Sequence, residues 1–341
     1  MHMADALLTP AVGGTLWAAT AGTIAWCSRH LRQELDDSRI PLMGVLAAFI
    51  FAAQMINFTI PGTGSSGHLG GGMILAILLG PYAGFLAMAS VLTVQALFFA
   101  DGGLLALGCN IFNLGFFPCF IAYPFIYRPM VGNDPTPRRV FAGASVAAVT
   151  GLQLGAFSVV LETFLSGVSA LPFGTFALLM QPIHLAIGLV EGVVTAAVIT
   201  FIGKARPELL ADATLAAAAG AASIRRIVIG LLLATLVIGG ILSWFASSHP
   251  DGLEWALEKS AGPEAPVAPA SPTRRFLDRV QEKTALLPGY DFRDTGEVAE
   301  RGEEPRAGTS VAGMVGGGLT LVLAAALGWL LRRRRPVQPR S

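Results

Sequence analysis

Long apolar runs, separated by short polar segments, constrain this chain more than any other feature of its sequence. A helix needs about 20 mostly apolar residues to cross a bilayer, and most of the runs approach that length. Charged residues make up 13% of the chain, against roughly 25% in soluble domains. The sequence therefore predicts an all-α integral membrane protein. The expected spans are about 8–27, 40–60, 70–79, 82–100, 104–127, 140–165, 175–203, 227–245 and 311–331.

Basic residues orient these spans, because cytoplasmic loops carry an excess of Lys and Arg. Placing Arg29 and Arg32 inside puts the N-terminus and the loop 61–68 outside. The run 70–79 is short for a span, and counting it as a short or broken one also brings the later clusters inside. These clusters are Arg128, Arg138, Arg139, Lys204, Arg206, Arg225, Arg226 and residues 332–335. We expect about nine transmembrane helices, with the N-terminus outside and the C-terminus inside.

The expected spans fall into two groups. Residues 1–205 hold seven of them and form the first predicted domain, and residues 226–335 hold two and form the second. An Ala-rich linker, 206–225, joins the domains on the predicted cytoplasmic side. The loop 246–309 lies outside, and its density of Pro and charge predicts partial disorder, with 250–259 as its ordered part.

The first two residues form a potential metal chelator. A free amine on Met1, the His2 amide nitrogen and the His2 imidazole follow one another along the chain and can close two chelate rings. Three such nitrogens, nearly coplanar and with a fourth position open, suit Ni(II) or Cu(II) better than Mg or Ca. The amine must be neutral and the amide must lose its proton, so affinity should rise with pH. In most chains a histidine after the first methionine has no function, so the site needs further support.

A second histidine provides that support. His68 ends the Gly-rich loop 61–68, at the mouth of the third span, and the predicted orientation puts it on the outer face with His2. Its imidazole can fill the fourth position. The loop also has the spacing G-x-G-x-x-G, but a dinucleotide site needs a preceding strand and an acidic residue about 20 positions later. Both are missing, and the glycines instead indicate a loop that needs conformational freedom.

Five polar residues are candidates to hydrogen-bond the metal ligands or to line the metal cavity. They are Asp5, Asn57, Ser65, Ser66 and Asn110. Each also has a structural interpretation. The serines can be plain loop residues, the aspartate can favour the dipole at a helix N-terminus, and the asparagines can make hydrogen bonds between spans. The sequence leaves both interpretations open.

His184 and Glu191 are ionisable residues within the seventh expected span. They lie seven positions apart and therefore on one helix face. An ionisable residue inside a span is a functional hypothesis by default. We expect His184 near the middle of the membrane, however, away from the outer site, so a structural role for the pair is favoured over metal binding.

Several functions lack support in the sequence. The net charge of +1 gives no global field for nucleic acid. The chain has no G-x-x-x-x-G-K-[ST] phosphate loop, so it cannot hydrolyse ATP itself. It has no H-E-x-x-H helix and no visible Ser/His/Asp set, so we expect no enzymatic activity. No motif indicates a bound organic cofactor.

Three blocks of the sequence resemble the nickel/cobalt substrate-capture component of energy-coupling-factor transporters. They are Met1-His2-Met3-Ala4-Asp5, the run 51–58 around Gln54 and Asn57, and the loop 62–71 with its Ser-Gly-His. Asn110-Ile111-Phe112-Asn113 and the run 184–192 are similar to further blocks of the family, so that the resemblance covers about residues 1–205. Pro250-Asp251-Gly252-Leu253-Glu254 and Gly289-Tyr290-Asp291-Phe292 resemble the two-span PDGLE auxiliary component, which the family carries as a subunit or a fusion.

The resemblance implies a function in the plasma membrane of a prokaryote. It implies that the Met1 amine, the His2 amide and imidazole nitrogens and the His68 imidazole hold Ni(II), with Co(II) as the close alternative. It also implies a membrane coupling subunit, two cytoplasmic ATPases and a PDGLE part needed for loading metal. Met3, Ala4 and Ala6 depart from the common family start Met-His-Ile-Pro-Asp-Gly, whereas Asp5 keeps its place. A membrane assembly or sensor protein without transport is the alternative from another class.

Overall fold

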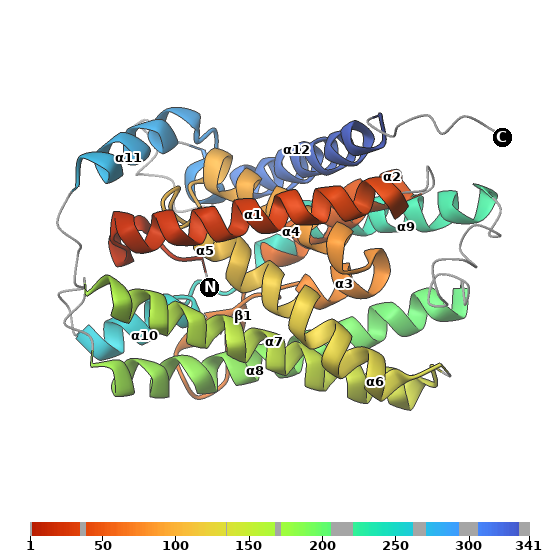
Figure 1. Ribbon diagram of the computed structural model, residues 1–341, viewed down its shortest axis with the longest axis horizontal. Helices are drawn as coiled ribbons and strands as arrows, with labels where there is room; N and C mark the ends of the chain where they lie inside the picture. The colour runs from red at the N-terminus through yellow and green to blue at the C-terminus, as the bar shows by residue number, and fades with distance from the viewer. Residues whose placement is uncertain are drawn as a thin grey trace.

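The computed structural model describes the chain in several stretches. They are residues 2–34, 39–133, 135–167, 172–205, 221–261, 271–292 and 306–333. Most of the long helices lie side by side along the long axis of the molecule (Figure 1). Helices suit a membrane because their backbone hydrogen bonds are made within each segment. The predicted all-α membrane architecture is therefore confirmed.

The elements before residue 206 form the first part of the structure. They are η1 (Asp5–Leu7), α1 (Pro10–Glu34), α2 (Arg39–Gln54), β1 (Phe58–Ile60), β2 (Ser65–Gly67), α3 (Gly72–Leu79), α4 (Pro81–Phe99), α5 (Leu107–Ile111), η2 (Phe112–Tyr127), α6 (Arg128–Val131), α7 (Pro137–Ser166) and α8 (Phe173–Ala205). The segment η2 is π-helical and contains Pro118 and Pro124. Proline donates no backbone hydrogen bond, and π turns are typical where a helix is locally disturbed.

Five helices among the described residues are long and apolar enough to cross a membrane. They are Pro81–Phe99, Leu107–Val131, Pro137–Ser166, Phe173–Gly203 and Ala307–Arg332. Helix α1, with 25 residues, and helix α9 (Ala221–Gly240), with 20 residues, also have the length of a span. The total of about nine spans and their orientation remain predictions.

The second expected span ends earlier than residue 60. Helix α2 stops at Gln54, and β1 then pairs antiparallel with β2. The apolar run continues past the end of the helix, but Pro61 and the positive φ angles of Gly62 and Gly64 turn the chain back on itself. This hairpin leads directly to His68. Helix α3 follows with only eight residues, in agreement with a short or broken third span.

The C-terminal part packs on the first part through helices. Its elements are α9, η5 (Leu242–Phe245), α10 (Gly252–Ala261), α11 (Pro272–Thr284), η6 (Pro288–Tyr290) and α12 (Arg306–Arg333). Helices α9 and α12 pack on each other and on α2. A Cβ atom at Gly313 would lie 2.3 Å from the Gly239 carbonyl oxygen, so the close crossing of α9 and α12 requires small residues.

Two expectations for the C-terminal part differ from the structure. Helix α9 begins at Ala221, inside the predicted linker 206–225, and the linker residues 206–220 lie outside the described part of the chain. In the loop 246–309, α10 agrees with the predicted order of 250–259, but α11 and η6 extend the described structure to residue 292. A tertiary contact helps to explain this order, because Gln281 of α11 donates to the carbonyl oxygens of Ala96 and Gly102.

Candidate metal-binding cavity

Buried hydrogen bonds hold the N-terminal tip inside the molecule. Asn110 contacts the Met3 backbone twice, because the Met3 N–H donates to its Oδ1 at 2.8 Å and its Nδ2 donates to the Met3 carbonyl at 3.3 Å. The Gly103 N–H donates to the same carbonyl at 2.9 Å. Met3 is fully buried, and so is most of Asp5, which accepts a backbone N–H from the segment after α4. These contacts fix the position of His2.

His2 lies against a carboxylate. Its Nδ1 is 3.3 Å from Asp101 Oδ1, and its side chain is only 7% exposed. Asp101 comes directly after Ala100, whose left-handed conformation (φ 53°) ends helix α4. The other Asp101 oxygen accepts a hydrogen bond from the Tyr290 hydroxyl. A single aspartate therefore connects His2 with a residue of the C-terminal part.

The loop that carries His68 is fastened to α8 and α2. Glu191 on α8 accepts the N–H groups of Gly70, at 2.7 Å, and of Gly71, at 3.2 Å. Gln54, at the end of α2, donates to the Gly70 carbonyl at 2.8 Å. Hydrogen bonds between backbone N–H groups and a carboxylate are among the strong ones in proteins. Glu191 therefore positions the loop that carries His68.

The imidazoles of His2 and His68 lie next to each other. Their ring centroids are 5.0 Å apart and their planes differ by 14°. His68 Nδ1 contacts the Leu69 carbonyl at 3.0 Å, so this nitrogen carries the hydrogen and Nε2 keeps the lone pair. Burial lowers the pKa of both imidazoles, to about 3 for His68, so that both are neutral near pH 7. Neutral imidazole is the form that binds a metal.

The segment Pro250–Glu254 runs alongside the His68 loop. The Ser66 N–H donates to the Pro250 carbonyl at 2.8 Å, and the Ser66 hydroxyl donates to the His249 carbonyl at 2.8 Å. The Trp255 indole N–H donates to a carbonyl of the hairpin turn at 3.0 Å. The C-terminal part thus adds a third chain segment to the β1–β2 hairpin.

In this segment, Asp251 and Glu254 cap helix α10, and Gly252 allows close packing on α8. Asp251 Oδ1 accepts the N–H groups of Leu253 and Glu254, both at 2.8 Å, and Glu254 accepts the Asp251 N–H at 3.3 Å. This reciprocal arrangement is a capping box at the start of α10. A Cβ atom at Gly252 would lie 2.6 Å from Cγ2 of Ile183, so only glycine lets the segment approach α8 this closely.

A cavity of about 520 Å³ lies between the tip, the His68 loop and the C-terminal part. Its ionisable lining residues are His2, His68, Asp101, His249, Asp251, Glu254, Tyr290 and Asp291. Burial acts to raise the pKa of Asp251, but nearby positive charge and the hydrogen bond from the Glu254 N–H outweigh it. The net pKa is lowered, so this carboxylate is ionised at neutral pH. The cavity therefore offers a cation negative charge beside neutral imidazoles.

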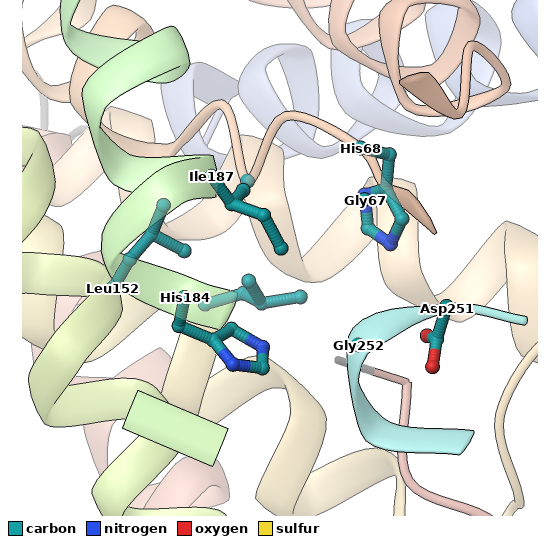
Figure 2. A pocket seen from close by; sticks show the side chains of 9 residues that line it. Gly67, His68, Leu152, His184, Ile187, Asp251 and Gly252 are labelled. Atoms are coloured by element: carbon teal, nitrogen blue, oxygen red, sulfur yellow. The ribbon is translucent and has the colours of Figure 1, made fainter. Parts of the chain in front are cut away.

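A second cavity, of about 10 Å³, adjoins His68 on the side of α8. Figure 2 shows the His184 imidazole projecting toward the segment that carries Asp251 and Gly252. The expectation that His184 lies away from the outer site is wrong, because the hairpin loop reaches into the bundle and meets α8 there. His184 is not hydrogen-bonded to Glu191 either, since its Nδ1 donates to the carbonyl four residues earlier.

The other predicted residues that the structure describes either line the larger cavity or hold neighbouring backbone segments in place. Met1 lies outside the described residues, whereas Asn57 lines the larger cavity. Asp5 was a candidate partner of His2, but its Oδ1 instead accepts a hydrogen bond from the Ala106 N–H. The remaining candidates hold backbone segments in place: Ser65, Ser66, Asn110 and Glu191.

Sequence reasoning missed several ionisable residues of the larger cavity as possible contributors to the site, among them Asp101, Asp251 and Tyr290. Asp101 is the first charged residue after the expected span 82–100, and Asp251 and Tyr290 belong to the two blocks that resemble the PDGLE component. The sequence positions of these three residues could have marked them as candidates. Their proximity to His2 and His68 could not be predicted, because it depends on how the C-terminal part packs.

Side chains alone do not complete a metal site in the described part of the chain. No three of its His, Cys, Asp and Glu side chains are arranged to hold one ion. Imidazole nitrogens bind metals such as zinc at about 2.0–2.1 Å, so two adjacent rings can supply two ligands. The remaining ligands of the predicted set are backbone nitrogens, which belong to residues 1 and 2.

Two family models match the chain. Residues 2–209 match the model described as cobalt uptake substrate-specific transmembrane region, and residues 225–333 match the PDGLE domain. Among solved structures, a truncated transition metal transporter is 28% identical with a TM-score of 0.53. The match covers 60% of this chain and 99% of that one.

Curated relatives match over the first part or over the whole chain. A putative metal transport protein of Haloquadratum walsbyi is 44% identical over 62% of this chain and 93% of its own length. A putative fused nickel transport protein, NikMN, of Archaeoglobus fulgidus is 32% identical over 98% of both chains. The cobalt transport protein CbiM of Geobacter sulfurreducens is 32% identical over 93% of this chain and 87% of its own.

Proposed function

The chain belongs to the family of cobalt uptake substrate-specific transmembrane proteins and carries a PDGLE domain, and on this premise we propose that it captures Ni(II) for import. Proteins of this family are nickel and cobalt transport components and not enzymes. The chain is a multi-pass membrane protein of a prokaryote. We further propose which metal ion is captured, which atoms bind it and which source of energy drives its import.

The observation that carries the proposal is the juxtaposition of His2 and His68. Two neutral imidazoles, 5.0 Å apart at their centroids, lie on a cavity that also presents carboxylates. We infer that one ion binds to both rings and to the His2 amide nitrogen. The Met1 amine, which the family resemblance implies as a ligand, completes four nitrogens. Such a set favours Ni(II), because N-rich planar coordination suits this ion.

Cobalt is the second candidate substrate, and a specific observation favours it. The matching family model is described by cobalt uptake, and the Geobacter relative that aligns with 93% of this chain is named a cobalt transport protein. Two fused relatives, from Archaeoglobus and Rhodobacter capsulatus, are instead named for nickel. Because the Archaeoglobus relative that matches 98% of both chains is named for nickel, we place nickel first.

ATP hydrolysis by partner subunits is the proposed source of energy. The chain itself contains no phosphate-binding loop. We propose an energy-coupling-factor assembly with a membrane coupling subunit and two cytoplasmic ATPases. In this assembly the chain binds the ion, and its partners drive the release.

Binding of NiCl₂ to the purified full chain tests the proposed ligands. We expect tight binding by the wild type and an affinity at least about 100-fold lower for His2→Ala and for His68→Ala, which is about 2.7 kcal/mol. A third arm extends the N-terminus by three residues, which moves the amine away and should also weaken binding. His30→Ala is the control, because His30 contacts Tyr82 and Trp26 and not the cavity.

The same titration separates the two metals and the alternative class of function. Tighter binding of CoCl₂ than of NiCl₂ would reverse the proposed order of substrates. Unchanged nickel affinity in both histidine variants would refute the site. Transport itself is tested by radioactive nickel uptake into cells with intact and with ATPase-deficient partner subunits. Equal uptake in the two would exclude the ATP-driven mechanism.

A further inference from the structure

His184 is held in the form that a metal ligand requires. Its Nδ1 is 2.7 Å from the Met180 carbonyl oxygen, which can only accept, so Nδ1 carries the hydrogen and Nε2 keeps the lone pair. Metal-binding histidines almost always donate their second ring nitrogen to a carbonyl or carboxylate in this way. The side chain is 1% exposed, and Nε2 has no hydrogen-bond partner among the described residues.

The small cavity is where this nitrogen lies. Its polar side chains are His68, His184 and Asp251, and its remaining walls are glycine and aliphatic residues: Gly67, Gly70, Leu114, Leu152, Ile187 and Gly252. A volume of about 10 Å³ corresponds to roughly one water-sized particle. Both His68 and Asp251 also line the large cavity, so the two cavities share two potential ligands.

We propose that His184 Nε2 binds the metal at a second, inner position, which the ion reaches from the His2–His68 site. Asp251 supplies a carboxylate, and His68 passes the ion on by turning its imidazole from the large cavity toward the small one. The turn is needed because the described side chains do not close around a single point in this conformation. Imidazole and carboxylate ligands suit a divalent ion of this series. The inference rests on the proposed function and adds a step to it.

Binding at the inner position can be measured only when tight binding at the His2–His68 site has been weakened. In His2→Ala the outer site loses one of its two imidazoles, whereas the proposed ligands of the inner position, His68, His184 and Asp251, all remain. We expect this variant of the full chain to keep weak, saturable binding of NiCl₂ and CoCl₂. Adding His184→Asn should lower the residual affinity at least tenfold and remove the Co(II) absorption bands of the inner site. Asparagine keeps a donor near the place of Nδ1 for the Met180 carbonyl but has no counterpart of Nε2.

Two further variants separate a ligand from a structural residue. Asp251→Asn preserves a good helix cap and removes the negative charge, so it should also weaken residual binding in the His2→Ala background. His30→Asn is the matched control, because His30 Nδ1 likewise contacts the carbonyl four residues earlier, at 3.1 Å from the Trp26 oxygen. It should change neither residual binding nor the Co(II) spectrum. Thermal unfolding of each variant verifies that the fold is retained.

The outcomes distinguish this inference from the proposed function. If the wild type binds no nickel or cobalt, the proposed function fails. If the wild type binds tightly but His2→Ala has no residual binding, the inner position does not exist. Residual binding that survives His184→Asn unchanged also overturns the inference, and His184 then serves only the packing of α8.

Discussion

The N-terminal tip and the segment Pro250–Glu254 are far apart in the sequence and reach the same cavity, but they are held in place differently. The tip depends on side chains, since the Asn110 amide makes two hydrogen bonds to the Met3 backbone. The segment depends on its own backbone and on the absence of a side chain at Gly252, which lies against α8. A substitution that removes the Asn110 amide can disrupt the attachment of the tip, whereas a substitution that adds a side chain at Gly252 can disrupt the attachment of the segment.

This difference indicates different tasks. A tip that presents ligands must be held closely, because displacement of a ligand by about 1 Å can abolish a well-formed site. A segment that covers the cavity can tolerate changes in side chains that do not contact the ion, as long as its backbone still pairs with Ser66. We therefore expect metal affinity to be most sensitive to the contacts of the tip and least sensitive to the Glu254 side chain, which completes the helix cap of the segment.

Among the substitutions that test this comparison, Asn110→Ala should have the largest effect. It leaves the buried Met3 N–H without its acceptor, and an unsatisfied buried group costs about 1–3 kcal/mol. Because the same contact positions His2, we expect nickel affinity to fall at least about tenfold, as measured by titration calorimetry of the full chain. Unchanged affinity would show that the tip does not need this contact.

The matched control for this variant is Asn113→Ala. Asn113 is also buried in the same helical segment, but its amide donates to Glu162 at 3.0 Å and not to the tip. Its replacement should lower thermal stability by a similar amount and leave nickel affinity within about twofold. Equal losses of affinity in both variants would attribute the effect to general destabilisation.

Much of the helical framework could be predicted because hydrophobicity decides it. The expected spans 82–100 and 140–165 correspond closely to α4 and α7, where apolar residues end at polar or Gly/Pro-rich turns. The end of α2 could not be predicted in this way, because apolar residues continue through Ile60. There the hairpin, and not hydropathy, decides which residues are helical.

The adjacency of His2 and His68 was also predictable, since the orientation predicted from the basic loops puts both on one side. The partnership of His2 with Asp101 and the approach of His184 to the His68 loop were not. Both depend on how far the loop reaches into the bundle, which is a property of tertiary packing. A residue's depth along a span therefore says little about its distance from a loop that folds inward.

Gly252→Ala should have an intermediate effect. The new methyl group would lie 2.6 Å from Ile183 Cγ2 and 3.3 Å from the His184 ring, so the segment must move away from α8. Such overpacking costs about 1–3 kcal/mol, and we expect nickel affinity to fall about threefold to tenfold. Gly230→Ala on α9 is the control, because its Cβ would meet no atom within 4 Å. Equal affinities of the two variants would separate the segment from the metal site.

Glu254→Ala should have the smallest effect, and it separates the cap from the cavity. The variant removes one hydrogen bond, from the Asp251 N–H at 3.3 Å, but the two bonds that Asp251 Oδ1 accepts do not depend on the Glu254 side chain. An exposed capping contact contributes about 1 kcal/mol or less, so we expect a small decrease in thermal stability. Nickel affinity should stay within about twofold, as it should for Glu258→Ala on an exposed position of the same helix. A tenfold loss for Glu254→Ala alone would mean that its carboxylate, and not only its cap, contributes to the capture of the ion.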